Sequence, residues 1–290
     1  MVDTTTKAGS NGLTLVTGGT GKTGRRVVER LRAAGRAVRV GSRRGTPAFD
    51  WADESTWAGA LEGVSAVYLA YLPDLSAPGA LGVVTRFLDA MKRAGAERVV
   101  LISDRGEPSS QEAEKIVARS GLEWTVVRCA WFHQNFDEGE FMGMVMDGLL
   151  TLPAGAVKEG FVDADDIAAV AVAALIEDGH KGEVYEVTGP ELLGFDEVAT
   201  ILSEATGRAV RYQAVTMTEF GDGLREAGVP EDFVQLLSHI LETLDGRNQT
   251  LGDGVQRALG RPAKPFADYA RRVGAAGAWN AVGESEVARG

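Results

Sequence analysis

A cluster of glycines between a short apolar run and an amphipathic stretch constrains the fold of this chain more than any other feature. Residues 13–17 (LTLVT) are rich in branched side chains and predict a buried strand. The cluster Gly18-Gly19-Thr20-Gly21-Lys22-Thr23-Gly24 follows directly, and residues 25–34 then carry apolar side chains at helical spacing. The order of strand, glycine turn and helix predicts the first half of a βαβ unit.

Two glycine spacings fit this turn. Gly19, Gly21 and Gly24 satisfy G-x-G-x-x-G, and Gly18 in place of Gly19 satisfies the wider G-x-x-G-x-x-G. Either spacing suits a tight turn, close approach of a pyrophosphate and close packing of helix on strand, with the helix amino terminus facing the phosphates. The alternative is a plain turn between strand and helix. A P-loop is excluded because Val16 occupies the position of its first glycine.

The alternation of strands and helices continues along the first half of the chain. Strands are expected at residues 37–40, 66–70, 98–102 and 123–127, and helices at residues 55–61, 83–94 and 112–120. A short third strand is expected to end at Asp50-Trp51, which brings the sheet to about six strands. The fold class is therefore predicted to be α/β, with a Rossmann-like doubly wound parallel sheet.

The pattern changes after Arg128, where aromatic residues and methionines replace the regular alternation. A helix is expected at 163–176, a strand at 183–188, a helix at 195–206 and a strand at 209–215. We therefore expect a smaller C-terminal α+β substrate domain. The expected segments are a disordered N-terminal stretch (1–12), an NAD(P)-binding Rossmann domain (13–130), a mainly substrate-binding region with some segments returning to the Rossmann sheet (131–273) and a flexible tail (274–290).

Composition disfavours several classes of partner. The 41 acidic residues exceed the 30 basic ones and give a net charge of -11, which repels a nucleic-acid backbone. Apolar runs stay well below the ~20 residues of a membrane helix, and the polar amino terminus has no signal-peptide core. A single cysteine, Cys129, rules out an internal disulfide framework. We expect a cytoplasmic protein without nucleic-acid or membrane partners, and a homodimer remains possible.

The residues after the second strand predict the choice of dinucleotide. An acidic residue there binds a ribose 2′-hydroxyl, whereas arginine binds a 2′-phosphate. The sequence has Ser42-Arg43-Arg44, which favours NADP(H), with NAD(H) possible and a solvated basic turn as the alternative. Asp50-Trp51 is expected beside the adenine. The expected cofactor-binding residues are Gly18, Thr20, Gly21, Lys22, Thr23, Gly24, Ser42, Arg43, Asp50, Trp51, Ala70, Tyr71, Leu72, Pro73 and Ser103.

Several further motifs follow the glycine turn in a fixed order. They are residues 114–125 (EKIVARSGLEWT), Phe132-x-x-Asn135-Phe136, residues 161–168 (FVDADDIA) and residues 185–190 (YEVTGP). With the glycine turn, these motifs resemble the NmrA-like branch of the atypical short-chain dehydrogenases over residues 13–273. The resemblance implies NAD(P) binding. Members of that branch include NADPH-dependent quinone and triphenylmethane reductases, isoflavone-type reductases and a regulator that binds dinucleotide without turning it over.

The usual catalytic pair of short-chain dehydrogenases is missing from the sequence. Those enzymes use Tyr-x-x-x-Lys, in which lysine lowers the tyrosine pKa so that the hydroxyl donates a proton. None of the five tyrosines here has a lysine four residues later. By the resemblance, Ser110 and Glu114 stand at the two positions. Quinones and conjugated cations need less protonation when they accept hydride. The absence of the tyrosine and lysine pair therefore favours substrates of this class.

Two residues are candidates for a substitute acid. Ser103 stands where the resemblance places the dehydrogenase serine, and Asp104 beside it replaces a small residue and makes the site acidic. His133 is the more attractive donor, with a half-buried residue satisfied by backbone as the alternative. The catalytic candidates are thus His133 and Ser103. The expected substrate-binding residues are Trp131, Phe132, His133 and Asn135.

No metal site is expected in this chain. Asp163, Asp165 and Asp166 precede an apolar helix, so we expect one of them to cap it rather than to bind a cation. Cys129 is expected to be buried and inert.

The sequence predicts an NAD(P)H-dependent oxidoreductase that transfers hydride to a planar conjugated small molecule, such as a quinone or a polyketide-like aromatic. The substrate is expected in a cleft between the two domains. One alternative is a non-catalytic NAD(P)-sensing regulatory protein. Another is a cofactor-dependent oxidative tailoring enzyme of secondary metabolism.

Overall fold

The computed structural model describes residues 12–244, 246 and 248–280, and this part of the chain forms two compact units. The first unit comprises the chain up to residue 129 together with 164–187 and 252–262. The second comprises 130–163, 188–251 and the chain from 263 onward. The expected disordered stretch at 1–12 lies outside the described residues except for Gly12.

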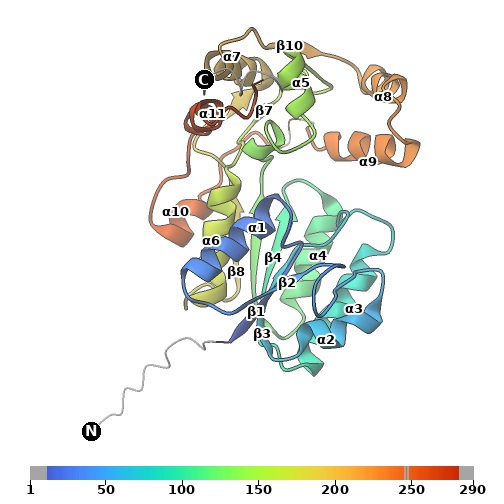
Figure 1. Ribbon diagram of the computed structural model, residues 1–290, viewed down its shortest axis with the longest axis vertical. Coiled ribbons are helices and arrows are strands. Elements are labelled where there is room, and N and C mark those ends of the chain that lie inside the picture. The colour runs from blue at the N-terminus through green and yellow to red at the C-terminus, as the bar shows by residue number, and fades with distance from the viewer. Residues whose placement is uncertain (1–11, 245, 247, 281–290) are drawn as a thin grey trace, which may run out of the picture. The chain divides into compact units, whose positions relative to one another are not determined.

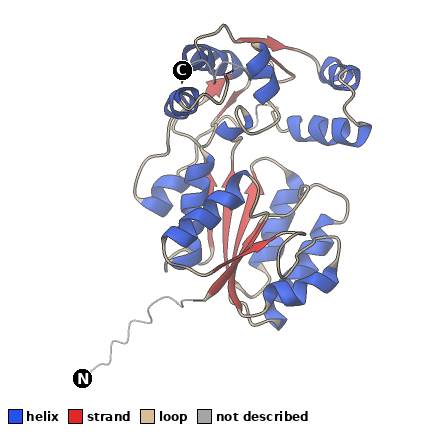
Figure 2. Cartoon of the chain, in the orientation of Figure 1, coloured by secondary structure: helices blue, strands red, loops and turns tan. Residues whose placement is uncertain are grey.

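A six-stranded parallel sheet forms the centre of the first unit (Figures 1 and 2). The strand order is β2-β1-β3-β4-β5-β8. The chain runs outward from β1 in one direction to β2 and in the other to β3, which creates the topological switch point of a doubly wound sheet. The predicted fold class is confirmed. The strands are β1 (Leu13–Thr17), β2 (Val38–Gly41), β3 (Val64–Leu69), β4 (Arg98–Asp104), β5 (Glu123–Cys129) and β8 (Glu183–Val187).

The sixth strand is not the one expected from the sequence. Asp50 forms only an isolated bridge with Asp53, so the short third strand expected to end at Asp50-Trp51 is absent from the described fold. The sixth position belongs instead to β8, which pairs with β5 from Thr125↔Glu183 to Cys129↔Val187. Without a neighbour, the edge of β5 would leave its backbone N–H and C=O groups unpaired. β8 pairs with this edge after the chain has passed through the second unit.

Helices cover both faces of this sheet (Figure 1). One face packs on α2 (Trp57–Leu61), α3 (Ala80–Arg93) and α4 (Pro108–Ala118), and buries the alternate strand residues Leu15, Val67, Leu69, Val99, Leu101 and Val126. On the other face α1 (Lys22–Ala33) lies beside α6 (Ala164–Ile176), with α10 (Gly254–Leu259) against α6 and β8. α6 carries apolar side chains on nearly all sides, which is typical of a helix enclosed by its neighbours. A 3₁₀ turn (Glu54–Thr56) precedes α2.

The second unit combines short strands with helices around an aromatic core. Phe136, Phe161, Phe195 and Phe266 each have at most 2% of their surface exposed. β6 pairs with β10 in parallel, and β7 pairs with β9 antiparallel. The elements are a 3₁₀ turn (His133–Asn135), α5 (Met142–Asp147), β6 (Leu149–Leu152), β7 (Lys158–Glu159), β9 (Leu193–Gly194), α7 (Phe195–Thr206), β10 (Arg211–Ala214), α8 (Met217–Glu226), α9 (Glu231–Leu241) and α11 (Phe266–Ala275).

The structure has ordered residues where the flexible tail (274–290) was expected to begin. α11 continues to Ala275, and the Trp279 side chain is buried, with its Nε1 donating to the Phe136 carbonyl at 2.8 Å. The expectation is therefore wrong for residues 274–280, where an aromatic anchor holds the chain to the core. Residues 281–290 lie outside the described part.

None of the helices in the described ranges has the length and apolar character needed to cross a bilayer.

Candidate functional site

The glycine turn after β1 is built so tightly that side chains would not fit. Gly18 has φ +62°, and its carbonyl accepts a hydrogen bond from the Gly21 N–H at 2.9 Å. A Cβ on Gly24 would stand 2.2 Å from the Gly18 oxygen, and one on Gly19 would stand 2.9 Å from a Val40 methyl carbon. The first turn of α1 therefore lies directly against backbone, which is the geometry that brings a pyrophosphate close to the main chain.

The amino terminus of α1 suits a phosphate group. Its N-cap is Gly21, which has no side chain to satisfy the N–H groups of the first turn. The first turn carries no acidic residue and begins with Lys22. Thr20 and Gly21 are exposed, whereas Thr23 is buried and its hydroxyl accepts a hydrogen bond from the Tyr68 hydroxyl at 2.9 Å. The helix dipole and the uncapped N–H groups together favour an anion here.

The ends of β1 and β3 are tied together beside this turn. The Thr17 hydroxyl accepts from the Ala70 N–H at 2.8 Å and lies 3.1 Å from the Tyr68 carbonyl oxygen. A Cβ on Gly18 would be 3.3 Å from the Ala70 Cβ. The expected ribose-facing residues therefore begin directly beside the glycine turn, where Tyr71 is half-buried and Leu72 is 56% exposed.

The end of β2 presents two cations. Arg43 and Arg44 are exposed, and neither forms an ion pair with the residues that the structure describes. The Ser42 carbonyl closes the loop by accepting from the N–H groups of Gly45 and Phe49 at 3.0 and 2.9 Å. The guanidinium of Arg43 is thus available to a ligand phosphate.

Trp51 carries a donor that the described residues leave unused. Its ring lies 5.0 Å from the Tyr71 ring and 4.8 Å from the Phe87 ring, and its Nε1 is buried with no acceptor among the described residues. A buried N–H without a partner is costly, so a ligand acceptor at this point would relieve it. Trp51 is one of the two residues expected beside the adenine. Asp50 instead stabilises its own loop, since its backbone carbonyl accepts from Trp57 Nε1 at 2.8 Å.

A chain of ionic hydrogen bonds runs across the carboxyl ends of β4, β5 and β8. Ser103 Oγ donates to Glu114 at 2.7 Å, and Arg128 Nε donates to the same carboxylate at 2.9 Å. Arg128 also reaches Glu186 at 3.4 Å, and Arg105 Nε donates to Glu186 at 2.9 Å. The Ser103 proton is committed to Glu114, so the structure argues against Ser103 as the substitute acid.

Asp104, one residue further along β4, is a titratable group whose importance the sequence reasoning missed. It is half-buried, and Ser110 Oγ donates to its Oδ2 at 3.1 Å. Burial is the main cause that raises the pKa of Asp104 to about 6, and the nearby carboxylates of Asp74, Glu107 and Glu114 add to the rise. The available signal was a carboxylate at a strand end where the resemblance expects a small side chain.

His133 lies in the aromatic core of the second unit. It has no exposed surface, its Nε2 donates to the Phe161 carbonyl at 2.9 Å, and its ring packs on Phe266 and Tyr269 at 5.0 and 5.1 Å. Burial lowers the pKa of His133 to about 4, although the Asp163 carboxylate opposes the shift. A neutral imidazole is a very weak acid, and the N–H of this buried ring is bonded to the Phe161 carbonyl, so the structure argues against His133 as the proton donor.

The remaining expected substrate residues differ in exposure. Trp131 and Phe132 are half-buried, and the Trp131 ring stacks on Phe141 with centroids 5.8 Å apart. Asn135 is 8% exposed within the 3₁₀ turn. Trp131 and Phe132 thus keep apolar surface that a flat ligand can contact, whereas His133 and Asn135 belong to the interior.

The aspartates around the start of α6 are engaged by arginine and amide groups. Asp165 lies 3.3 Å from Arg26, and Asp166 lies 2.7 Å from Arg261. Asp163 directly precedes the helix and accepts from Gln134 at 2.9 Å. Within the described ranges, no three His, Cys, Asp or Glu side chains are grouped in a way that would hold a metal ion.

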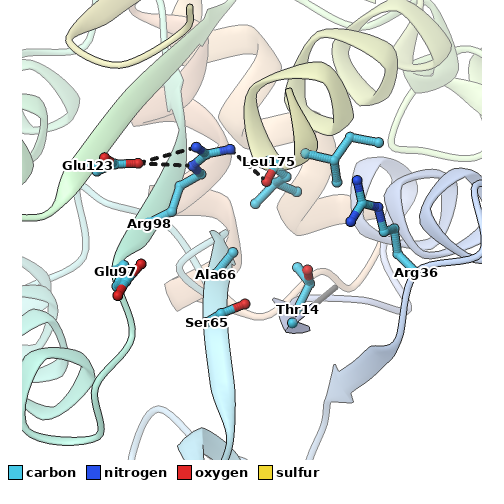
Figure 3. A pocket seen from close by; sticks show the side chains of 10 residues that line it. Thr14, Arg36, Ser65, Ala66, Glu97, Arg98, Glu123 and Leu175 are labelled. Atoms are coloured by element: carbon cyan, nitrogen blue, oxygen red, sulfur yellow. Dashed lines mark hydrogen bonds and ion pairs between the residues drawn. The ribbon is translucent and has the colours of Figure 1, made fainter. Parts of the chain in front are cut away.

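Cavities at the other edge of the sheet serve the fold. A cavity of about 60 Å³ is lined by residues at the amino ends of β1, β3 and β4, and Figure 3 shows the Arg98 guanidinium between Glu123 and the Leu175 backbone. Arg98 contacts Glu123 at 3.2 Å and donates to the Leu175 and Glu177 carbonyls at 3.1 Å. It thereby satisfies the carboxyl terminus of α6. A second cavity of about 180 Å³ shares both Arg98 and Glu123.

Sequence comparison places these features in a known family. A profile of NAD(P)H-binding proteins matches residues 18–178. An oxidoreductase of Bacillus subtilis called YesF is 34% identical and aligns with 88% of this chain and 93% of its own length. An NAD(P)H azoreductase of Xenophilus azovorans is 33% identical over 90% of this chain and 98% of its own. Agroclavine dehydrogenase of Claviceps fusiformis is 33% identical over 88% and 95%.

Solved structures show the same fold. The Citrobacter sp. triphenylmethane reductase complexed with NADP(H) superposes with a TM-score of 0.75 at 22% identity, covering 89% of this chain and 99% of that one. The Escherichia coli quinone oxidoreductase QOR2 complexed with NADPH gives 0.76 at 22% identity, covering 90% and 99%. The regulator NmrA in complex with NAD gives 0.69 at 17% identity, covering 92% and 96%.

Proposed function

The chain belongs to the NAD(P)H-binding family, among the NmrA-like atypical short-chain dehydrogenases, and from this membership we propose that it is an NADPH-dependent reductase of planar conjugated small molecules. The observation that carries the proposal is the uncapped, glycine-lined amino terminus of α1 at the switch point of the sheet. In open α/β sheets, ligands bind outside the carboxyl ends of the strands at this point.

The residues that would hold the dinucleotide follow the carboxyl edge of the sheet. The turn from Gly18 to Gly24 would hold the pyrophosphate on backbone N–H groups. Ser42 and Arg43 would bind the 2′-phosphate, and the unused Trp51 Nε1 would face the adenine. The other half of the dinucleotide would then extend along Ala70–Pro73 toward Ser103. The preference for NADPH over NADH rests on Arg43.

The substrate class follows from the acid–base groups and the apolar surface. The bound dinucleotide supplies hydride. Trp131 and Phe132 offer flat, partly exposed apolar faces. These surfaces suit a planar acceptor, and relatives named azoreductase and agroclavine dehydrogenase support a conjugated one. Holding donor and acceptor in contact would supply most of the rate acceleration.

One observation favours a second function, the binding of NAD(P) as a signal without turnover. Glu114 stands where the resemblance places the catalytic lysine, and it is paired with Ser103 and Arg128. A glutamate there does not lower the pKa of a hydroxyl donor. A protein that only senses the dinucleotide has no need for that pair.

The test is oxidation of NADPH by the purified protein against a panel of quinones, enones, azo compounds and cationic dyes. NADPH and NADH binding are titrated in parallel by fluorescence. Turnover of any acceptor at a rate above the protein-free control supports the reductase. Tight NADPH binding with no turnover across the panel contradicts it and supports the sensor.

A further inference from the structure

The carboxyl end of β4 holds an acidic group that the family resemblance does not explain. Asp104 is the last residue of this strand and follows Ser103 directly. Ser103 is 1% exposed, whereas Asp104 is half-buried and therefore has solvent-accessible surface. Of these two neighbours, Asp104 is the one that can meet a ligand at the carboxyl edge of the sheet.

The side chains at the positions of the missing tyrosine and lysine form hydrogen bonds with Asp104 and with its neighbour Ser103. Ser110, at the tyrosine position, donates its hydroxyl to Asp104 Oδ2 at 3.1 Å. Glu114, at the lysine position, accepts from Ser103 at 2.7 Å and from Arg128 at 2.9 Å. The Ser110 bond orients the Asp104 carboxyl group, and the Arg128 pair fixes the position of the Glu114 carboxylate.

The groups around Asp104 are mainly carboxylates. Asp74 lies on the loop after β3, Glu107 precedes α4, and Glu114 lies within α4. All three raise the pKa of Asp104 further after burial has raised it, so its value of about 6 exceeds that of an ordinary aspartate despite the Ser110 hydrogen bond. Cys129 is opposite Asp104 on β5, and burial keeps its thiol pKa well above the usual value. Arg105, which follows Asp104 in the sequence, forms an ion pair with Glu186 at 2.9 Å.

We propose that Asp104 is the proton donor of the reductase reaction, an inference that rests on the function proposed above. As hydride from the bound dinucleotide adds to a conjugated acceptor such as a quinone, the protonated carboxyl of Asp104 gives its proton to the oxygen that gains the electron pair. The acceptor is reduced by two electrons, the dinucleotide is oxidised, and the Asp104 carboxylate recovers a proton from water.

The proposal separates two kinds of acceptor. A quinone needs hydride and a proton to reach the hydroquinone at neutral charge. A cationic triarylmethane dye becomes neutral on accepting hydride alone. Asp104 is therefore needed for the quinone and dispensable for the dye, provided that the substitution leaves cofactor binding intact.

The test compares the variant Asp104→Asn with the native protein on both acceptors. Asparagine keeps the size of the side chain and an oxygen for the Ser110 hydrogen bond, but it has no proton to release. We expect kcat/KM for a benzoquinone to fall by about 100-fold or more, and that for a cationic dye to change by less than about threefold. The NADPH dissociation constant should stay unchanged. The control Glu112→Gln, on the exposed side of α4, should behave as the native protein on both acceptors.

Two pH measurements complete the test. In the native protein, kcat/KM for the quinone should rise as the pH falls and level off below about pH 6. The variant Asp74→Asn removes one repelling carboxylate, so the rise in kcat/KM should occur at lower pH. Independently of activity, carbon NMR of protein labelled at the aspartate carboxyl groups should show a signal that titrates near pH 6 and is missing from Asp104→Asn.

The outcomes distinguish failure of the inference from failure of the proposed function. Equal losses on quinone and dye, or no loss on either, overturn the role of Asp104 while the reductase stands. The absence of turnover by the native protein with every acceptor overturns both. Loss confined to the quinone, with the NMR titration near pH 6, supports the proposal.

Discussion

At the scale of single residues, burial shifts His133 and Asp104 in opposite directions and gives them opposite capacities. It lowers the pKa of the imidazole to about 4 and raises the pKa of the carboxyl to about 6, because in each case the neutral form is favoured. At pH 5 the histidine therefore lacks its acidic proton, whereas the aspartic acid retains one. Residue type alone suggests the reverse assignment.

The burial of His133 predicts acid sensitivity of the fold. Its pKa is near 6.5 in the unfolded chain and about 4 in the native protein, so the unfolded state binds the extra proton as the pH falls through this window. Stability from the neutral histidine is fully present above pH 6.5 and is lost progressively toward pH 4. We expect His133 to lower the free energy of unfolding in urea by about 2 kcal/mol between pH 7 and pH 5, while the raised pKa of Asp104 acts in the opposite direction because the native state binds a proton there.

The variant His133→Gln checks this assignment. Glutamine retains an N–H donor for the Phe161 carbonyl but does not titrate. The part of the change in unfolding free energy between pH 7 and pH 5 that His133 causes should therefore disappear in this variant. His239→Gln, on the exposed side of α9, should leave the difference unchanged. Identical pH dependence in the native protein and His133→Gln would show that other groups cause the acid sensitivity.

Arg43 carries a prediction about cofactor choice. Its exposed guanidinium at the end of β2 is proposed to bind the 2′-phosphate, and a charge-assisted hydrogen bond of this kind contributes about 1.5–3 kcal/mol. We expect Arg43→Ala to weaken NADPH binding about 10- to 100-fold and NADH binding very little, as measured by fluorescence titration. Arg32→Ala on the exposed side of α1 is the matched control. Equal losses for the two dinucleotides would refute the assignment.

At the scale of elements, the contact of α1 with the glycine turn determines the proposed phosphate site. A methyl group on Gly24 would meet the Gly18 oxygen at 2.2 Å, and backbone cannot move aside as a flexible side chain can. We expect Gly24→Ala to displace the start of α1, to destabilise the protein by about 1–3 kcal/mol and to weaken NADPH binding. Thermal unfolding and NADPH titration measure the two effects.

The matched control for Gly24 is Gly223, an exposed glycine within α8. A Cβ there meets no atom within 4 Å, so Gly223→Ala should stabilise the helix by about 0.5–1 kcal/mol and leave NADPH binding unchanged. If both alanine variants behave alike, the tight packing of α1 on the turn is not what the proposed site depends on.

At the scale of the whole molecule, the chain returns to the first unit after leaving it. α6 covers one face of the sheet, and β8 pairs with the edge of β5, yet both follow residues 130–163 of the second unit. Ile167, Val170 and Val187 of these returning elements are fully buried. A Rossmann unit that stopped at residue 129 would expose that apolar surface and an unpaired strand edge.

This topology predicts how fragments behave. We expect residues 1–129 alone to lack a cooperative thermal transition by circular dichroism. A shortened chain in which flexible linkers join residue 129 to 164 and residue 187 to 252, ending at 262, should unfold cooperatively because it retains α6, β8 and α10. Cooperative unfolding of the 1–129 fragment at the temperature of the full chain would contradict the role of the returning elements.

The sequence by itself determined the features that depend on neighbours along the chain. The glycine turn, the alternation of strands and helices, and the helix at 195–206 follow from local spacing and backbone geometry, and the structure has the same α/β class and the same α7 bounds. Local patterns also predicted that Cys129 would be buried. These properties arise from hydrogen bonds and steric limits within a few residues.

Only the tertiary structure decided features that depend on residues far apart in the sequence. β8 takes the sixth strand position because it completes the edge of β5, and Trp279 anchors a tail that its composition suggested was loose. Burial in an aromatic core lowers the pKa of His133, and burial together with the carboxylates of Asp74, Glu107 and Glu114 raises the pKa of Asp104. Solvent access and electrostatic fields are sums over such distant neighbours, so no local pattern in the sequence contains them.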